Sequence, residues 1–494
     1  MYMRNIYYFF AILVFSGLST ANRVPDEPPN VLLILSDDLN TRIGPYLAQE
    51  GHTPYLDGLA ERGVQFDRAY CQFPLCGPSR ASIMSGLYPE TNGVLGNQHV
   101  VGSYRGSNPE LADHPSLAGF FREQGYFTAR VSKVFHMGVP GGIERGEAGD
   151  DDPDSWDFAV NIMGPETLSP GEIELLSPQH PHYGSSFARM KVPDTLQETQ
   201  TDYLATSQAI AILESRAART IPGATNKLKI KPTEPFFLAV GLVRPHVPFI
   251  APDNCFEPYP DHEMAIPEGN IDPNLPAAAY ANRNDRIWKM DIEQQRRSIS
   301  GYLASVRFMD QQVGRLLRTL ERLDLADNTI VVFVSDHGFL LGEHDSWQKV
   351  NLWEGTIRVP LLIADPRYPD QHGLKAGNIT ELIDLYPTLA ELCGLEGALP
   401  DRLQGISQAP LIHSGEPSDA NRLAYTITNR GKYASIRRGP YHYIRWGEEL
   451  KGGNEALFHL VDDPEEHENL AASTAYTEIL EQMRALLTQK QATF

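Results

Sequence analysis

Two uninterrupted apolar runs, far apart in the chain, limit most strongly the fold that this sequence can adopt. The first is "NVLLILSDDL" (residues 30–39) and the second is "TIVVFVSDHG" (residues 329–338). Continuous runs of leucine and β-branched residues are typical of strands that are buried on both faces, as in parallel sheets. Further apolar runs at residues 235–249 and 359–366 alternate with helical patterns. The sequence therefore predicts an α/β fold with a sheet covered on both faces.

The N-terminal residues have the pattern of a secretory signal peptide. Arg4 is followed by the apolar run "YYFFAILVF" and then by small residues that end at Ala21. The run is short for a membrane-spanning helix, so we expect cleavage after about Ala21. An uncleaved anchor helix is the alternative. We expect the mature protein to be exported, periplasmic or secreted, without a stable membrane anchor.

The rest of the chain divides by its composition. We expect a signal peptide at 1–21, a large catalytic α/β domain at 22–405 and a smaller C-terminal subdomain at 406–494. Residues 141–231 are rich in Pro, Gly, Asp and His, and we expect insert loops around a pocket there. In the last segment, an alternating stretch turns at Gly439-Pro440 like an antiparallel hairpin, and an amphipathic closing helix follows.

Net charge excludes one class of partner. The 494 residues carry a formal net charge of −21, whereas binding to nucleic acid requires a basic face on the protein. We therefore expect no nucleic-acid partner. An anionic small substrate stays possible, because a local cluster of cations can reverse the field inside a cleft.

The four cysteines are Cys71, Cys76, Cys255 and Cys393. No Cys-x-x-Cys spacing occurs, so a thiolate zinc site is not expected. Four cysteines are too few for a disulfide scaffold in a chain of this length. Disulfide pairing of Cys71 with Cys76, or of Cys255 with Cys393, stays open from the sequence.

Acidic residues follow both apolar runs at the points where the strands should end. Asp37 and Asp38 follow the first run, and Asp336 and His337 follow the second. Because ligands bind outside the carboxyl ends of strands in open α/β sheets, these side chains can meet at one site. Adjacent carboxylates repel one another unless a cation neutralises them, and oxygen ligands suit Ca²⁺ or Mg²⁺. The alternative is that each pair simply caps a loop or a helix.

The stretch "CGPSRASIMSG", which begins at Cys76, is the most specific motif in the chain. A thiol is a poor ligand for a hard cation and is only partly ionised at neutral pH, so metal binding alone does not explain this cysteine. The stretch resembles the signature of type I sulfatases, Cys-x-Pro-Ser-Arg followed by a helix of small residues. In that family the cysteine is oxidised to formylglycine during export. The resemblance implies that residue 76 becomes formylglycine (3-oxoalanine) through a formylglycine-generating maturation enzyme.

The resemblance extends over nearly the whole mature chain. It includes "SKVFH" (132–136), "VRPHVPF" (243–249), "SDHGFLLGEH" (335–344) and "LVDDPEEHENLA" (460–471). Within the family, the first three stretches are similar to iduronate-2-sulfatases and their bacterial relatives. His337 departs from many sulfatases, which have Asn there. The resemblance implies an alkaline-phosphatase-like fold, with a large mixed, mostly parallel sheet flanked by helices and a small C-terminal α/β subdomain that contains an antiparallel sheet.

The resemblance also assigns roles to residues of this chain. One Ca²⁺ per chain would be bound by Asp37, Asp38, Cys76, Asp336 and His337. The catalytic group would comprise Cys76, Arg80, Lys133, His136, His246 and Lys349. In the family, one hydroxyl of the hydrated aldehyde attacks sulfur, and the other then loses its proton and expels sulfate. The two lysines would bind sulfate oxygens, where charge builds up in the transition state, and Arg80 would hold residue 76.

Two residues of the catalytic group receive roles in proton transfer, and two further residues are candidates for substrate binding. His136 would take the proton of the second hydroxyl, and His246 would protonate the leaving oxygen. Arg244 is a candidate for substrate binding, with a strand cap as the alternative. Asp151 is a candidate for contact with a sugar, with a solvated acidic loop as the alternative.

The sequence and the resemblance together favour a secreted sulfatase that acts on a sulfated glycan. We expect an exo-acting enzyme of the iduronate or uronate 2-O-sulfatase type, with a sulfated oligosaccharide and the maturation enzyme as its partners. A sulfatase for another polysaccharide, of the ulvan, carrageenan or fucoidan type, is one alternative. A phosphodiesterase or phosphonate hydrolase of the same superfamily is a second, although those enzymes typically use Ser, Thr or two metals. An inactive exported glycan-binding protein is the non-enzymatic alternative.

Overall fold

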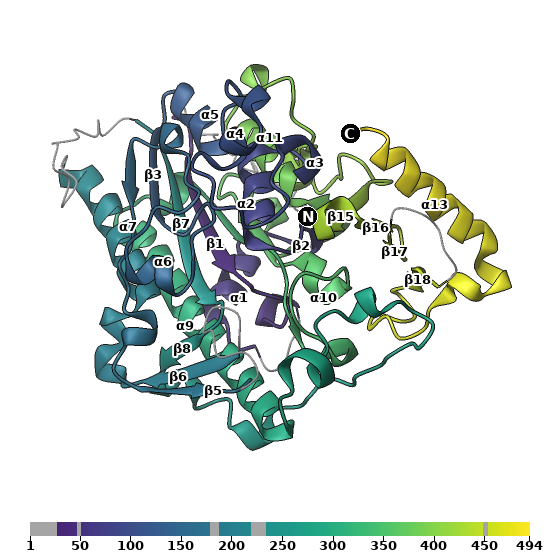
Figure 1. Ribbon diagram of the computed structural model, residues 1–494. Helices are drawn as coiled ribbons and strands as arrows, with labels where there is room; N and C mark the ends of the chain where they lie inside the picture. The colour runs from purple at the N-terminus through teal and green to yellow at the C-terminus, as the bar shows by residue number, and fades with distance from the viewer. Residues whose placement is uncertain (1–26, 47–50, 178–186, 219–233, 448–452) are drawn as a thin grey trace, which may run out of the picture.

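The computed structural model describes residues 27–46, 51–177, 187–218, 234–447 and 453–494 (Figure 1). A nine-stranded sheet forms its centre in the order β12-β2-β13-β9-β1-β7-β3-β4, with β14 beside β2. In chain order these strands are β1 (Asn30–Asp37), β2 (Val64–Tyr70), β3 (Phe127–Ser132), β4 (Phe158–Val160), β7 (Phe236–Pro245), β9 (Thr329–Ser335), β12 (Arg358–Val359), β13 (Leu361–Ala364) and β14 (Leu374–Glu381). Strands β9, β1, β7, β3 and β4 run parallel, whereas β13 is antiparallel to both β9 and β2. The expected large, mixed and mostly parallel sheet is confirmed.

Helices cover both faces of this sheet because its central strands are apolar on both sides. Alternate side chains of β1 pack into two separate cores. One core includes residues of α2 (Cys76–Ser85), α5 (Leu117–Glu123) and α11 (Leu385–Leu392). The other includes residues of α1 (Pro54–Glu61), α7 (Thr201–Ala218) and α9 (Ile292–Arg322). The continuous apolar runs predict this two-sided burial.

A four-stranded antiparallel sheet lies at the C-terminal end of the fold, on the right of Figure 1. Its strands are β15 (Leu423–Thr428), β16 (Tyr433–Arg438), β17 (Tyr441–Trp446) and β18 (Glu455–His459). The expected hairpin joins β16 to β17, and the expected closing helix is α13 (Thr477–Gln491), which packs on these two strands. The core of this sheet includes Phe73, Tyr88 and Ile383 from the larger part of the fold. A division of the chain at residue 405 stays a prediction.

The segment of residues 141–231 holds more regular structure than its sequence indicates. Helix α7 spans 18 residues and packs against β7 and α9. Its buried positions include Ala205 and Ala209, so small side chains obscure the apolar periodicity that marks a helix. Strands β5 (Glu172–Leu175) and β6 (Ala188–Val192) pair with each other, and β6 pairs with β8 (Phe249–Pro252). The expectation of loops is therefore wrong for residues 201–218.

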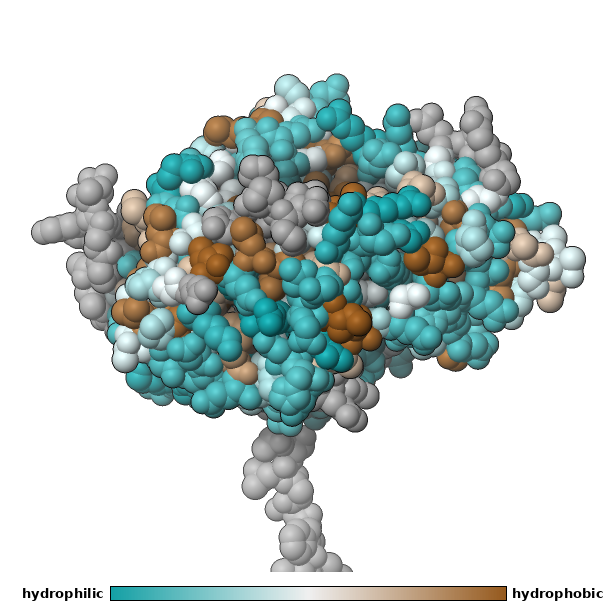
Figure 2. Space-filling model, turned by 60° about the horizontal axis from the view of Figure 1, so that its bottom comes forward, coloured by the Kyte–Doolittle hydropathy of each residue, from teal (hydrophilic) through white to brown (hydrophobic). Residues whose placement is uncertain are grey.

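Four further expectations or features can be compared with the structure: the surface, the signal peptide, the absence of a membrane span and the state of the thiols. The face shown in Figure 2 is mostly hydrophilic, with apolar residues in small separate groups. The expected signal peptide lies outside the described residues, which begin at residue 27. Among the helices that the structure describes, none has both the length and the apolar character needed to cross a bilayer. All four cysteines are described, and each is buried and free, so neither disulfide considered above is formed.

The carboxyl ends of the central parallel strands bring distant parts of the chain together. Strands β1 and β9 are in register, with Ser36 opposite Ser335, so the acidic residues that follow each strand are neighbours. Strands β3 and β7 end directly before Lys133 and His246. The candidate residues therefore gather at one edge of the sheet, where α/β folds bind their ligands.

Candidate active site

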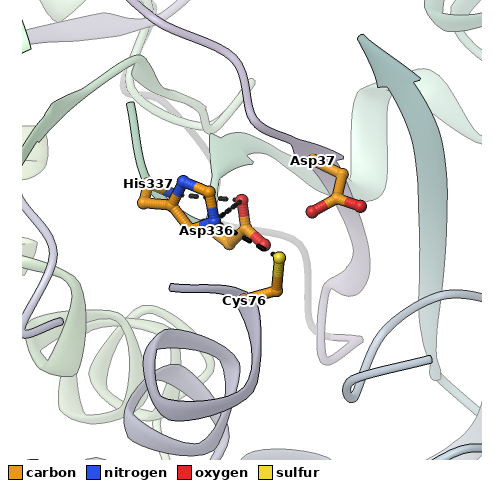
Figure 3. Close-up of side chains that lie close together, drawn as sticks. All are labelled: Asp37, Cys76, Asp336 and His337. Carbon is orange, nitrogen blue, oxygen red and sulfur yellow. Dashed lines mark hydrogen bonds and ion pairs between the residues drawn. The ribbon is translucent and has the colours of Figure 1, made fainter. Parts of the chain in front are cut away.

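Cys76 lies at the first turn of α2 and faces the ends of β1 and β9. Figure 3 shows its side chain close to Asp37, Asp336 and His337. One ligand atom from each of these four side chains lies within 4.8 Å of the other three, and all four residues are buried. The Cys76 Sγ is 3.4 Å from His337 Nε2. Residues from three separate elements thus converge on one thiol.

Asp38 joins this cluster from the position after β1. Its Oδ1 is 3.3 Å from His337 Nε2, and ligand atoms of Asp38, Cys76 and His246 lie within 4.8 Å of one another. Asp37 Oδ1 and Asp38 Oδ2 are buried, and neither accepts a hydrogen bond. Converging carboxylates with buried, unbonded oxygens are an arrangement that a hard divalent cation stabilises. The donor set therefore fits one Ca²⁺ or Mg²⁺ ion.

The backbone fixes the orientation of both imidazoles that face Asp38. The Nδ1 of His337 is 2.9 Å from the carbonyl oxygen of the next residue, and because a carbonyl only accepts, this nitrogen carries a proton. His246 has the same contact at 2.6 Å. The other ring nitrogens then face Asp38. The His337 Nε2 atom lies 3.3 Å from Asp38 Oδ1, and the His246 Nε2 atom lies 3.8 Å from Asp38 Oδ2. Such hydrogen bonds on the far nitrogen are how proteins orient imidazole ligands and proton donors.

Arg80 and Ser79 tie α2 to the ends of the strands. Arg80 is fully buried, and its Nε donates to Asp336 Oδ2 at 2.7 Å. Its NH2 group lies 3.4 Å from Asp37 Oδ1, and its NH1 group donates to the carbonyl oxygen of Val134 at 3.2 Å. Ser79 Oγ donates to the carbonyl oxygen of Asp336. Arg80 thus contacts two of the carboxylates around Cys76 and backbone carbonyl oxygens near the ends of the strands.

Two lysine ammonium groups favour negative charge at residue 76. Lys349 Nζ is 3.2 Å from Cys76 Sγ, and Lys133 Nζ pairs with the Asp37 carboxylate. Burial alone would raise the pKa of the Cys76 thiol, but Lys349 and Lys133, together with His337 and a hydrogen bond with His136, hold that pKa well below its usual value. The other buried thiol of this region, Cys71, has the opposite shift, because burial and Asp336 raise its pKa. The site therefore stabilises an anion at residue 76 specifically.

His136 lies beside Cys76, beyond the end of β3. Burial lowers the pKa of His136 to about 4, although contact with Cys76 opposes this shift. The imidazole is therefore neutral at neutral pH, which is the state that accepts a proton. Its Nδ1 is buried and has no hydrogen-bond partner, and its ring centroid lies 5.3 Å from that of His99.

Arg244 supports the loop that carries His246. Its NH2 group donates to both carboxylate oxygens of Glu166 at 2.7 Å. Its NH1 group donates to the carbonyl oxygens of His246 and Pro248, at 3.1 Å each. Asp202 accepts the backbone N–H of Arg244 at 3.0 Å. Substrate binding by Arg244 stays a prediction, since the observed contacts hold the loop.

Asp151 is likewise engaged by groups of the protein. Its Oδ2 accepts from Arg130 at 2.7 Å, and its Oδ1 accepts from Trp156 Nε1 at 3.0 Å. The preceding residue, Asp150, is nearer to the site, because its backbone N–H donates to the carbonyl oxygen of His136 at 2.8 Å. Contact of Asp151 with a sugar stays a prediction.

Sequence reasoning missed four residues that border the site: Ser79, Asn97, Asp150 and Glu166. Asn97 Oδ1 accepts the backbone N–H of Gly77 at 2.9 Å, at the start of α2. Ser79 could have been found, because it lies inside the cysteine motif. Asn97 stands in an irregular segment and Glu166 begins a three-residue 3₁₀ helix, and neither has a sequence pattern that marks it.

Comparisons with known proteins show to which family the chain belongs. Residues 29–395 match the family model described as Sulfatase, and residues 342–493 match the one described as N-sulphoglucosamine sulphohydrolase, C-terminal. A protein named sulfatase from Formosa agariphila is 30% identical, over 95% of this chain and 88% of that protein. The iduronate 2-sulfatase of Homo sapiens is 30% identical, over 78% of this chain and 72% of that protein. A solved structure of a 2-O GAG sulfatase is similar with a TM-score of 0.67 at 23% identity, and the match covers 94% of this chain and 92% of that one.

The comparisons agree with what the motif and the fold indicate. The resemblance that begins at Cys76 is confirmed by the family match, which includes the motif and the ends of β1, β3, β7 and β9. The alkaline-phosphatase-like architecture is confirmed by the sheet order together with the similar solved structures. The chain belongs to the sulfatase family and is a sulfuric ester hydrolase.

Proposed function

We propose that this chain is an exported sulfatase that removes a 2-O-sulfate from a uronate at the end of a sulfated glycan. The observation that carries the proposal is the position of Cys76. Its thiol lies among Asp37, Asp336 and His337 within 4.8 Å, and two lysines favour negative charge there. A group that attacks sulfur at this point would have both lysine ammonium groups and oriented imidazoles close to it.

We infer that residue 76 acts as formylglycine and that one Ca²⁺ is held beside it. Formylglycine supplies, as its hydrate, a hydroxyl that attacks sulfur and a second hydroxyl whose deprotonation releases sulfate. Ca²⁺ supplies positive charge that polarises the sulfate oxygens. The residues that would hold the ion with residue 76 are Asp37, Asp38, Asp336 and His337.

Lys349 and Lys133 bind the sulfate oxygens in this proposal. The Lys349 ammonium already lies 3.2 Å from the atom of residue 76 that faces the site, and both lysines lower the pKa of that group. A sulfate ester placed next to residue 76 therefore meets fixed positive charge. Electrostatic stabilisation of this kind is greatest where negative charge builds up in the transition state.

His136 and His246 divide the proton transfers. His136 has a pKa of about 4 because it is buried, so it is unprotonated and can accept a proton from residue 76. The Nδ1 of His246 is held by a backbone carbonyl, which leaves Nε2 to protonate the leaving oxygen. Arg244 keeps this imidazole in place through the loop carbonyls.

Two relatives support the choice of substrate. The human relative is named iduronate 2-sulfatase, and the similar solved structure is of a 2-O GAG sulfatase. We therefore propose a uronate 2-O-sulfate ester rather than another position or another sulfated polysaccharide. Two similar solved structures are of phosphonate monoester hydrolases, with TM-scores of 0.69 and 0.72 at 21% and 20% identity, and at that identity the likeness supports the shared fold alone. The relative named iduronate 2-sulfatase is 30% identical, so we favour the sulfate ester.

Release of sulfate from defined disaccharides tests the proposed function. We expect the wild-type enzyme to desulfate a disaccharide that carries a 2-O-sulfate on its terminal uronate, as followed by ion chromatography of sulfate. A disaccharide with only a 6-O-sulfate on its hexosamine should react at least about a hundredfold more slowly, because the sulfate would lie outside the reach of residue 76. A reversed preference would contradict the proposed substrate while leaving the sulfatase chemistry intact.

A further inference from the structure

A cavity of about 620 Å³ opens beside the segment that follows His136. Helix α6 (Gly141–Glu144) supplies part of its wall, and His99, Arg145 and Asp150 also line it. The cavity adjoins the candidate active site through His136, whose carbonyl oxygen accepts from Asp150 N–H at 2.8 Å and whose ring lies 5.3 Å from the His99 ring. A group bound in this cavity is therefore a neighbour of the imidazole that borders residue 76.

The backbone approaches closely at one point of the cavity wall. Gly149 has a positive φ of 66°, and a Cβ there would stand 2.1 Å from the carbonyl oxygen of His136. No side chain larger than hydrogen fits at that distance. Glycine at this position allows Asp150 to be drawn against the His136 segment.

Asp150 presents an unsatisfied acceptor at this place. The residue is 6% exposed, and its buried Oδ1 accepts no hydrogen bond. The nearest basic group is His99 Nδ1, at 3.9 Å, which is beyond hydrogen-bond distance. Burying a carboxylate oxygen without a donor is costly, so a donor from a ligand would relieve the cost. The adjacent Asp151 offers nothing comparable, because both of its oxygens already accept hydrogen bonds.

Two basic side chains line the outer part of the same cavity. Arg145 and His99 have side chains that are 64% and 66% exposed. Arg145 is paired with the exposed Glu147 at 2.6 Å. Exposed pairs of this kind contribute little stability, so an anionic ligand can replace Glu147 at small cost. The cavity thus combines one buried acceptor with basic groups near solvent.

We propose that this cavity binds the uronate ring of the glycan, with Asp150 Oδ1 accepting a hydrogen bond from a ring hydroxyl and Arg145 and His99 facing the carboxylate. The inference rests on the proposed function, because it takes the ring to lie next to a sulfate at residue 76. It makes Asp150, rather than Asp151, the acidic residue that contacts the sugar. A hydroxyl donor satisfies the buried oxygen, and the basic groups select a sugar that carries an anion.

Two measurements on one variant test this proposal. The first is calorimetric binding of an unsulfated uronate disaccharide, and the second is turnover of 4-nitrophenyl sulfate, which has no sugar. For Asp150→Asn we expect the dissociation constant of the saccharide to rise by about tenfold to a hundredfold. This factor should be at least about ten times the factor by which aryl-sulfate turnover falls. Asp154→Asn is the matched control, because Asp154 belongs to the same acidic run but is 82% exposed and does not line the cavity. The control should change neither measurement.

The outcomes separate this inference from the proposed function. Saccharide binding that is absent in the wild type, or unchanged in Asp150→Asn, would overturn the inference whatever the turnover. An equal loss in both measurements would also overturn it, because Asp150 would then act by positioning His136. Absence of aryl-sulfate turnover in the wild type would count against the proposed chemistry alone, since saccharide binding does not depend on residue 76 reacting.

Discussion

At residue 76 the surrounding charges determine the chemistry more than the thiol itself does. Cys71 and Cys76 are both buried and lie five positions apart, yet the pKa of one is raised and that of the other is lowered. Lys349, Lys133 and two imidazoles lower the pKa of Cys76, whereas burial and Asp336 raise that of Cys71. A side chain at this place is therefore prepared to carry negative charge, which is what a nucleophile requires.

Substitution of Cys76 separates this role from a structural one. We expect Cys76→Ala to lower kcat for sulfate ester hydrolysis by at least about a thousandfold, because the attacking group is removed. Cys71→Ala is the control, since Cys71 is packed in the hydrophobic core and its Sγ makes a weak 3.9 Å hydrogen bond to the carbonyl oxygen of Thr356. That control should keep its turnover. Unchanged sulfate release from Cys76→Ala would rule out residue 76 as the nucleophile.

The pH dependence of kcat/KM reports on His136. The base must be unprotonated to act, and burial lowers the pKa of His136 to about 4. We therefore expect kcat/KM to stay level as the pH falls from 7 toward 5, and to decline as the pH passes through about 4. His136→Gln should reduce kcat and should also remove the decline of kcat/KM near pH 4. An acid limb centred near 6.5, the ordinary value for histidine, would contradict the assignment.

At the scale of elements, the strands of the central sheet were predictable from the sequence, whereas much of the structure within residues 141–231 was not. Runs of apolar residues such as residues 31–35 favour a strand buried on both faces, and the acidic residues after it are then expected at the sheet edge. Helix α7 escaped prediction because Ala205 and Ala209 fill its buried positions. The sequence could not show which of Asp150 and Asp151 is available to a ligand, because the two residues are adjacent and chemically identical. The structure distinguishes them, because Arg130 donates a hydrogen bond to Asp151.

The loop after β7 also depended on contacts that no local pattern reveals. Glu166 and Asp202, from two other segments, hold Arg244 by its side chain and its backbone. Arg244 in turn holds the carbonyl oxygen of His246. The sequence located the histidine, but only the folded chain shows what positions it.

Glu166→Gln tests whether this loop positions a proton donor. The change weakens the two-point contact with Arg244, so His246 should lose its place near the leaving oxygen. We expect kcat for a saccharide sulfate, whose alkoxide needs a proton, to fall by about tenfold or more. Turnover of 4-nitrophenyl sulfate should fall much less, because its phenolate leaves without protonation. Glu174→Gln, which alters a 2.8 Å contact with Arg189 of β6 and leaves the contacts of Arg244 in place, is the control.

An equal loss of turnover on both substrates in Glu166→Gln would assign Glu166 a purely structural role. A loss confined to the saccharide substrate in Glu174→Gln as well would show that any weakened ion pair in this insert has the same effect. Either result would remove the positioning argument for the loop.

At the scale of the whole molecule, the C-terminal sheet is joined to the segment that leads into the active site. In β15, the Ile427 N–H donates to the carbonyl oxygen of Gln72 at 3.0 Å, and Thr426 Oγ1 donates to that of Cys71 at 2.6 Å. Arg422, just before β15, pairs with Glu381, the last residue of β14, and with Asp384, three residues later. Buried hydrogen bonds and ion pairs thus join the two sheets a few residues from Cys76, and we call this set of contacts the polar seam.

Removal of Arg422 should destabilise the molecule as a whole. Arg422→Met leaves Glu381 and Asp384 buried without their cation, so we expect the free energy of unfolding to fall by about 3–5 kcal/mol in urea denaturation. The control is Arg62→Met, which breaks a pair with Glu321 whose side chains are 50% and 52% exposed. That change should cost at most about 1 kcal/mol. Similar losses in both variants would contradict a special role for the seam.

The most direct test of the account is mass spectrometry of the peptide that contains residue 76, isolated from active, exported protein. The central claim is that this cysteine becomes an aldehyde, because its surroundings favour an oxygen nucleophile beside a hard cation. We predict that a substantial fraction of chains carries formylglycine and that specific activity rises in proportion to this fraction. Fully active enzyme in which every chain keeps the unmodified thiol would contradict the claim.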